Sequence, residues 1–508
     1  MLGDRRFGKV MRVASTSPDT GQQGGFAPRK TDTAHAPAGK RARALCLIVY
    51  FMKKTFCPHQ RAVLALAVSS LFALHAQAQT LQDVVVTPTT SEQPLADALP
   101  STLLIGREEI GQSQARDLPQ VLRMLAGVDV GQAGPSGSQT SIFLRGGEGR
   151  NTLVLIDGVP LNRGDFGTAS LQYLGADQIE RIEVVRGNVS ALYGSAAVGG
   201  VIQVFTRQHS QPSVSVEIGE RGNYRTSLGA GLRSDRTRLS VGATSERAGG
   251  YSAKDPLLFL GADADKDVGK SESLSLNAQH ELTKGHALSV RYLSGRNKSE
   301  YDGNGPDDRL DAKTEWVGLR SENAWSPVWS SKVDLSENTE RFSDATGYIK
   351  EGKNRSAQLL WDNTVKLVPG QSLQLGLEHR RIRFDDNPST GYRPRRVNAV
   401  RLGYVGQQGS FNWQANLRRD RTIDFGDASS YYLGLGYALS PQVKLIGSAS
   451  TAFNAPSFID LASQDPTLPP LKAERASNRE LGIQYSAGGL LTRATVFTNH
   501  QRDRIEYD

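Results

Sequence analysis

The chain has 508 residues, enough for several domains or for one large β-barrel, and it carries a net charge of +8. The basic residues are scattered along the chain rather than gathered in a stripe or a basic helix, which argues against a nucleic-acid-binding protein. The sequence contains no GxSxG, HExxH, Walker A or CxxC motif, and its eight histidines are dispersed. It therefore predicts a protein that is not an enzyme.

The N-terminal region contains a second methionine that is a better candidate for the translation start than Met1. Residues 1–51 show no structural pattern, whereas Met52 is followed by basic residues, an apolar run at 62–74 and a small-x-small site that ends at Ala78. This arrangement is typical of a secretory leader, and the apolar run is too short for a membrane anchor. We expect residues 1–51 to be a misassigned start or unstructured, and residues 52–78 to be a signal peptide.

Beyond this leader, the chain has no apolar run of about 20 residues, the length that a membrane-spanning helix needs. Both cysteines, Cys46 and Cys57, precede the predicted cleavage site. The mature chain is therefore predicted to hold neither a disulfide nor a thiolate metal site.

A short β-branched segment opens the mature chain. Three successive valines near a free terminus can add as a strand to the exposed edge of another sheet, with backbone hydrogen bonds supplying most of the affinity. The alternative is that they form the first strand of the domain that follows. The segment consists of Asp83, Val84, Val85, Val86 and Thr87.

A helix is predicted next. Leu118, Val121, Leu122 and Leu125 recur at helical spacing. Asp117 is a suitable N-cap, and a glycine two residues past the last of these leucines is typical of a helix end.

Residues 141–207 combine many glycines with three predicted strands. Leu153–Ile156 is entirely apolar, which is typical of a strand covered on both faces, and Asp157-Gly158 predicts a tight turn after it. Residues 179–185 alternate apolar and charged side chains, so one buried and one ionic face are expected. Residues 201–206 form the third predicted strand. Glycines beside β-branched residues indicate a small domain whose backbone approaches another surface closely.

The segments LVLIDGVPLN and RGNVSALYGSAAVGGVIQVFT within this stretch resemble the plug domain of TonB-dependent outer-membrane receptors, and among these most resemble the cobalamin receptor. Asn188 stands where the family usually has Pro, and Gln203 where it usually has Asn. The resemblance implies a plug at 93–211, and a flexible N-terminus at 79–92 that carries the Ton box at 83–87. It also implies a TonB partner energised by ExbB and ExbD.

From residue 212 the pattern changes to strict alternation of polar and apolar residues, as in Tyr224–Leu232 and Val443–Ala449. Period-two alternation with one apolar face predicts a transmembrane antiparallel β-barrel whose lumen holds the α/β plug. About fifteen strands fit between residues 212 and 508, whereas the family implies 22, so we expect a fragment that ends inside a strand. A smaller barrel or a soluble β-sandwich is the alternative.

One acidic cluster stands out in a predicted loop, at Asp263, Asp265 and Asp267. Carboxylates at alternate positions suit Ca²⁺, although the glycine and glutamate of an EF-hand are missing. The alternative is a solvated acidic loop. The resemblance implies that these aspartates correspond to the calcium-binding loop of the cobalamin receptor, with Asp302 as a further ligand and Asp255 as a weaker candidate.

Substrate contacts are expected from outward-facing plug loops, where small and amide residues allow a bulky corrin to approach, and from one aromatic residue of a barrel loop. The alternative for the plug loops is that their glycines only make them flexible, and the alternative for the tyrosine is that it lies at the membrane interface. The candidates are Gly134, Ser136, Gly137, Ser138, Gln139, Arg163, Asp165 and Tyr301.

Together, these features predict a receptor of the bacterial outer membrane that contacts outer-membrane lipid and lipopolysaccharide and actively imports cobalamin or another corrinoid. One alternative is a ferric-siderophore receptor of the same family. Another is a passive, porin-like barrel with a vestigial plug, or a non-functional truncated product.

Overall fold

The fold is described from a computed structural model, which covers residues 85–86, 89–134, 136–252, 254–255, 258, 265–302, 308–345, 347–386 and 391–506. The predicted leader and the residues before it lie outside these ranges. In the described part of the chain, no helix has the length and apolar character needed to cross a membrane.

The plug is a small α/β unit with a five-stranded sheet in the order β3-β8-β9-β6-β7. Strand β6 pairs in parallel with β9, and the other neighbours are antiparallel. Its elements are β1 (Val85–Val86), β2 (Gln93–Pro94), β3 (Ser101–Ile105), α3 (Arg107–Ser113), α4 (Leu118–Leu125), β4 (Asp129–Gln132), β5 (Thr140–Phe143), β6 (Thr152–Ile156), β7 (Val159–Pro160), β8 (Ile179–Arg186), α5 (Ser190–Tyr193) and β9 (Gly200–Thr206).

Strand β6 lies between β9 and β7 and is covered on both faces, as its apolar sequence predicted. All five of its residues are buried. Asp157 and Gly158 both have positive φ, at 49° and 90°, so they form the tight turn that pairs Ile156 with Val159. Helix α4 begins after Asp117, whose side chain accepts a hydrogen bond from the backbone N–H of Gln120, and this confirms the predicted N-cap.

Strand β8 differs from its prediction. Ile182 and Val184 are buried as expected, but Glu183 on the charged face is also buried, at 1 % exposure. Arg181 compensates for this carboxylate at 3.1 Å and stacks on Phe205 at 3.6 Å from the ring centroid. Glu183 is therefore buried beneath an arginine of its own strand, whereas Arg181 stays partly exposed.

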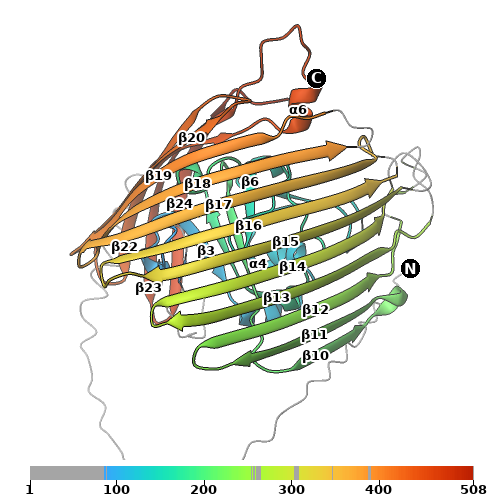
Figure 1. Ribbon diagram of the computed structural model, residues 1–508, viewed down its shortest axis with the longest axis horizontal. Helices are drawn as coiled ribbons and strands as arrows, with labels where there is room; N and C mark the ends of the chain where they lie inside the picture. The colour runs from blue at the N-terminus through green and yellow to red at the C-terminus, as the bar shows by residue number, and fades with distance from the viewer. Residues whose placement is uncertain are drawn as a thin grey trace, which may run out of the picture. The chain divides into compact units, whose positions relative to one another are not determined.

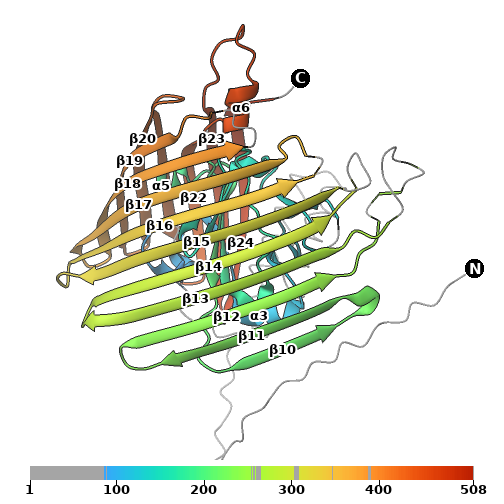
Figure 2. The same cartoon turned by 45° about the vertical axis from the view of Figure 1, so that its right-hand side comes forward.

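The second layer of the structure is a fifteen-stranded antiparallel sheet in sequential order from β10 to β24, which confirms the predicted mainly β architecture. Figure 1 shows the long, tilted strands curving around the plug elements, and Figure 2 shows the plug within the same concave face. The strands are β10 (Ser213–Ile218), β11 (Tyr224–Arg233), β12 (Thr237–Ala248), β13 (Gly269–Thr283), β14 (His286–Glu300), β15 (Arg309–Ala324), β16 (Trp329–Asp344), β17 (Glu351–Val368), β18 (Gln371–Asp386), β19 (Arg395–Gln408), β20 (Phe411–Thr422), β21 (Ala428–Ala438), β22 (Val443–Asn454), β23 (Glu474–Ala487) and β24 (Leu490–Arg502), with α6 (Phe458–Ser463) before β23.

The barrel sheet is apolar outside and polar inside, the reverse of a soluble protein. Leu228 and Leu433 on the outer face are 52 % and 50 % exposed, whereas Ser275 and Asn416 on the inner face are 2 % and 0 % exposed. This is the pattern of a barrel that faces lipid and holds a polar interior.

Gly229 of β11 faces the interior of the barrel, where a Cβ would lie 2.2 Å from His209 Cε1. The expectation that the chain ends inside a strand concerns Asp508, which lies outside the described residues. Strand β24 ends at Arg502, and after it Ile505 returns to the barrel, where its N–H donates to Glu474 at 3.0 Å.

Candidate functional site

The acidic residues singled out in the sequence converge where β13 begins and β14 ends. One carboxylate oxygen each from Asp265, Asp267 and Asp302 lies within 4.8 Å of the others, and Asp267 and Asp302 are buried. Asp302 also accepts hydrogen bonds from the backbone N–H of Lys254, at 2.6 Å, and from the Ser252 hydroxyl, at 3.3 Å. The donor set consists of hard oxygen atoms, which fits Ca²⁺. Asp263 lies outside the described residues.

The plug loop at 133–139 lies against this acidic region. A Cβ on Gly134 would be 3.7 Å from the backbone oxygen of Glu300, two residues before Asp302, and a Cβ on Gly269 would be 2.0 Å from the backbone oxygen of Ser136. The carbonyl oxygen of Gly137 accepts a hydrogen bond from Asn297 of β14 at 2.5 Å. A predicted substrate loop and the predicted metal loop are therefore neighbours.

Ser136 connects the plug to the barrel wall through two carboxylates. Its hydroxyl lies 2.8 Å from Asp117 at the start of α4 and 3.2 Å from Glu246 of β12. Burial raises the pKa of the Asp117 carboxyl, and the bonds from Gln120 and Ser136 oppose this shift only in part. Arg225 of β11 pairs with Glu246 at 3.7 Å.

A cavity of about 160 Å³ lies between plug loops and barrel loops. Its plug side includes Gln139, Arg163 and Phe166, and its barrel side includes Phe342 and Asp344. This combination of amide, aromatic and charged groups can hold a ligand by contact with both domains.

Tyr301 lies beside this cavity. Its hydroxyl donates to Asp344 at 2.5 Å, and its ring packs against an apolar cluster that includes Phe342 and Phe384. The ring is therefore positioned by the barrel, close to residues that line the cavity.

Arg163 and Asp165 have mainly buried positions. Arg163 pairs with Asp165 at 3.1 Å and with Glu340 of β16 at 2.9 Å, and Asp165 is 0 % exposed. Burial opposes the charge on Arg163, but the two carboxylates outweigh it and raise the pKa of the guanidinium. Their role in substrate binding stays a prediction. The sequence analysis did not select Glu340 or Asn354, although Asn354 accepts from the backbone N–H of Gly164 at 3.0 Å. Their inward position in an alternating strand was the available signal.

Ser138 is fully buried, and its hydroxyl has no hydrogen-bond partner among the described residues. Gln139 is the residue of this loop that lines the cavity. The plug loop is thus closely packed at its base, and one amide side chain reaches the cavity.

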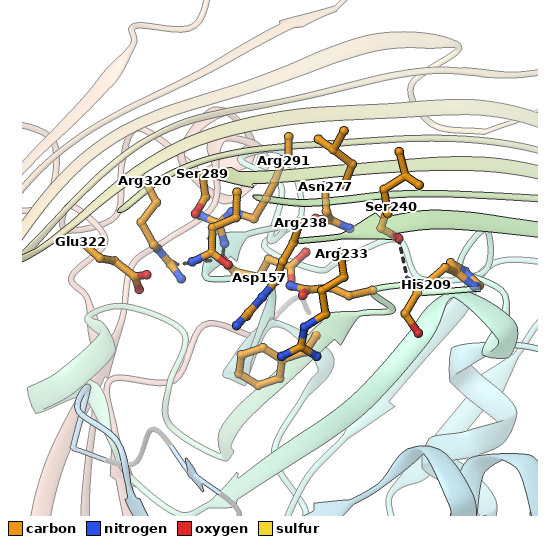
Figure 3. A pocket seen from close by; sticks show the side chains of 17 residues that line it. Asp157, His209, Arg233, Arg238, Ser240, Asn277, Ser289, Arg291, Arg320 and Glu322 are labelled. Carbon is orange, nitrogen blue, oxygen red and sulfur yellow. Dashed lines mark hydrogen bonds between the residues drawn. The ribbon is translucent and has the colours of Figure 1, made fainter. Parts of the chain in front are cut away.

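A second cavity, of about 290 Å³, lies at the opposite, short-turn end of the barrel. In Figure 3, Arg291 and Arg320 converge on Asp157 at the plug turn after β6. Both donate to the backbone oxygen of Asp157, and both pair with Asp334, at 3.2 and 2.6 Å. Burial lowers the pKa of His209, another lining residue, with a further contribution from Arg207. This site was not predicted, because its residues come from six separate segments of the chain.

The N-terminal valine segment is partly described. Val85 pairs with Pro94, and Val86 with Gln93, in the two-residue antiparallel pair of β1 and β2. Asp83, Val84 and Thr87 lie outside the described residues. The backbone of this segment is therefore held by its own chain, beside the start of the plug.

Comparison with known proteins agrees with this architecture. Residues 94–201 match the TonB-dependent receptor plug domain, and residues 212–508 match the TonB-dependent receptor-like β-barrel. The chain is 30% identical over 467 residues to the vitamin B12 transporter BtuB of Vibrio vulnificus, which covers 88% of this chain and 75% of that protein. It is 28% identical over 443 residues to BtuB of Photobacterium profundum, covering 85% and 71%.

Solved structures show the same fold. A ferric enterobactin receptor, PfeA, of Pseudomonas aeruginosa superposes with a TM-score of 0.68 at 22% identity, covering 82% of this chain and 73% of that one. The ferric-catecholate import receptor Fiu of E. coli gives 0.64 at 14% identity, covering 83% and 78%. The plug inside a lipid-facing barrel, the two family matches and the extent of the similarity lead to one conclusion: the chain belongs to the TonB-dependent receptors, transport proteins of the bacterial outer membrane.

Proposed function

We propose that this receptor imports cobalamin or a related corrinoid by TonB-dependent active transport. The observation that carries the proposal is the convergence of Asp265, Asp267 and Asp302 next to the plug loop at 133–139. The curated relatives named as vitamin B12 transporters support the same cargo.

Ca²⁺ is proposed as the ion that orders the acidic loop. Three carboxylates whose oxygens lie within 4.8 Å repel one another unless a cation neutralises them. Asp265, Asp267 and Asp302 would bind the ion, together with Asp263. Bound Ca²⁺ would hold the start of β13 and the end of β14 together beside Gly134 and thereby fix one wall of the ligand-binding mouth.

The cargo would contact the plug and the barrel together. Corrinoids carry amide groups around a large, mostly uncharged ring, so small and amide residues suit them better than free cationic groups do. Gln139 offers an amide at the cavity, and Tyr301 offers an aromatic face nearby. The Arg163 guanidinium is already paired with Asp165 and Glu340, which does not favour an anionic iron chelate at this position.

The energy for transport would arrive by protein contact. The valine segment at 83–87 would leave its pairing with β2 and add as a strand to TonB, energised by ExbB and ExbD. Because proline removes a backbone donor, Val85→Pro should stop growth on limiting cobalamin while leaving cobalamin binding intact. Unchanged growth would identify a passive pore instead.

The cargo is tested by equilibrium binding of cyanocobalamin to the purified receptor in detergent, with Ca²⁺ or with a chelator. Cobalamin should bind at least tenfold more tightly with Ca²⁺, and Asp265→Ala with Asp267→Ala should abolish this difference. Asp465→Ala, in an exposed loop that lies outside the cluster, is the matched control. Calcium-independent binding of a ferric catecholate with no binding of cobalamin would establish the siderophore alternative.

A further inference from the structure

The outer face of the barrel carries a cluster of arginines that the transport function does not use. On β18, the exposed residues Leu373, Leu375 and Leu377 are followed on the same face by Arg381 and Arg383, since alternate residues of a strand share a face. Figure 1 shows β17, β18 and β19 side by side in the barrel wall.

The strand register brings two more arginines to this face. Arg383 lies directly opposite Arg355 of β17, and Arg381 lies directly opposite Arg396 of β19. We refer to Arg355, Arg381, Arg383 and Arg396 as the arginine quartet. Like charges at directly opposite positions destabilise a sheet unless another group compensates for them.

The protein supplies only part of that compensation. Arg355 pairs with Glu337 at 2.6 Å, but no ion pair involves the other three arginines within the described ranges. The Nε atoms of Arg381 and Arg383 are shielded from solvent and have no hydrogen-bond partner there. An anion bound at these half-exposed arginines would supply acceptors that the described part of the protein does not.

Two other arginines on the same outer face have carboxylate partners. Arg296 of β14 pairs with Asp311 at 2.8 Å, and Arg341 of β16 pairs with Glu315 at 3.2 Å. These two arginines therefore have carboxylate partners of a kind that Arg381, Arg383 and Arg396 lack within the described ranges.

An apolar groove begins at the quartet. A depression of about 480 Å³ on the outer face is lined by five aliphatic residues of β15, β16 and β17, and by Ser336, Glu337, Gln358, His379 and Arg381. Ala357 lies between Glu337 and Arg381 across the strands, so a small side chain opens the groove beside the charges. The aliphatic residues are Val317, Leu319, Leu335, Ala357 and Leu359.

The position along the strand identifies the membrane leaflet. Arg381 and Arg383 lie toward the end of β18 that leads to the longer loop at 387–394, whereas Leu373 follows the short turn at 369–370. In outer-membrane barrels the short turns are periplasmic and the longer loops are extracellular. The quartet therefore lies beyond the apolar belt on the extracellular side.

We propose that the arginine quartet and the adjoining groove form a binding site for a phosphate-bearing lipid of the outer leaflet. The guanidinium groups hold the phosphate by charge-assisted, bidentate hydrogen bonds, and an acyl chain lies in the groove along Leu335 and Leu359. A soluble phosphate could use only the first half of this site. The continuity of charge and groove favours the lipid.

The test uses the full-length receptor in detergent, with native mass spectrometry and titration of bisphosphorylated lipid A as the probe. The same glycolipid with its phosphates removed should bind at least tenfold more weakly. Arg381→Gln with Arg383→Gln should remove this preference, whereas Arg296→Gln with Arg341→Gln should keep it. Arg381→Lys with Arg383→Lys should retain part of it, which separates loss of charge from misfolding.

Two further results bear on the groove and on the source of the phosphate. Ala357→Phe, which fills the groove, should weaken lipid binding several-fold without changing the displacement of lipid by pyrophosphate. Equal binding of both glycolipids, or equal losses in the quartet and control variants, would overturn the proposal. Saturation by pyrophosphate alone, with no effect of Ala357→Phe, would show a site for free anions and not for a lipid.

Discussion

Arg145 of the plug and Glu480 of β23 form a nearly buried ion pair at 2.5 Å, with side chains that are 9 % and 6 % exposed. The guanidinium also lies 4.2 Å from the ring centroid of Phe497 on β24. This pair joins the loop before β6 to the last two strands of the barrel sheet, so it fastens the plug at the side of the wall farthest in sequence from β10.

Removing Glu480 should loosen this attachment. Glu480→Ala leaves the Arg145 charge buried without its partner, which typically costs about 3–5 kcal/mol. The midpoint of thermal unfolding in detergent should fall clearly. Asp427→Ala, which breaks an exposed pair with Arg419, is the control and should change stability by less than about 1 kcal/mol. Equal shifts of the unfolding midpoint in both variants would show that the Arg145 pair stabilises the fold no more than the exposed pair does.

The Asp117 carboxyl should make the plug more stable at low pH than at high pH. Its folded pKa is raised above 3.8, so its contribution to stability is complete at low pH and is lost as the pH rises through the raised value. Asp117→Asn keeps an N-cap acceptor and should abolish this dependence without loss of stability near pH 7. Asp117→Ala should lose about 1 kcal/mol by removing the cap. Urea unfolding at several pH values measures both, and a dependence that survives in Asp117→Asn would assign it to another group.

Gly200 should tolerate no side chain. Its φ is 150°, and a Cβ would lie 2.2 Å from the backbone oxygen of Val185 in the neighbouring strand. Gly200→Ala should therefore push β8 and β9 apart and reduce the yield of folded receptor. Gly111→Ala, inside helix α3 and in open surroundings, should instead stabilise the plug by about 0.5–1 kcal/mol. Comparable stability of the two variants would contradict the close approach.

Removing calcium should expose the acidic loop to proteolysis. Trypsin should cut after Lys254 or Lys266 when a chelator is present and should cut slowly with Ca²⁺, because the ion ties Asp265, Asp267 and Asp302 together. Cleavage after the exposed Lys472 should be the same in both conditions. The variant Asp267→Asn with Asp302→Asn should be cut in either condition, and protection by Ca²⁺ in that variant would place the ion elsewhere.

Local chemistry was enough to predict much of the plug and barrel. Three signals depend on a few neighbouring residues and can be recognised without knowing what packs against them. They are the apolar run at 153–156, the cap at Asp117 and the alternation from residue 212. The number of barrel strands followed from the same alternation. The resemblance of two plug segments then indicated the family.

Features that depend on tertiary packing were not predictable. Glu183 was expected on an ionic face, yet it is buried beside Arg181. Glu340 and Asn354 hold the turn at 163–165 from strands that lie more than a hundred residues further along the chain. Arg291 and Arg320 meet Asp157 in the same way. Such residues look like ordinary inward-facing polar positions until the register of the sheet is known.

The short pairing of β1 with β2 has a mechanical consequence. Within the described residues, two residue pairs hold that ribbon together, Val85 with Pro94 and Val86 with Gln93. In an antiparallel hairpin, tension applied at the free end separates the pairs one after another, so each bears the load alone. A small pulling force would thus peel this ribbon first, and the taut chain would transmit the load to β3 at the edge of the plug sheet.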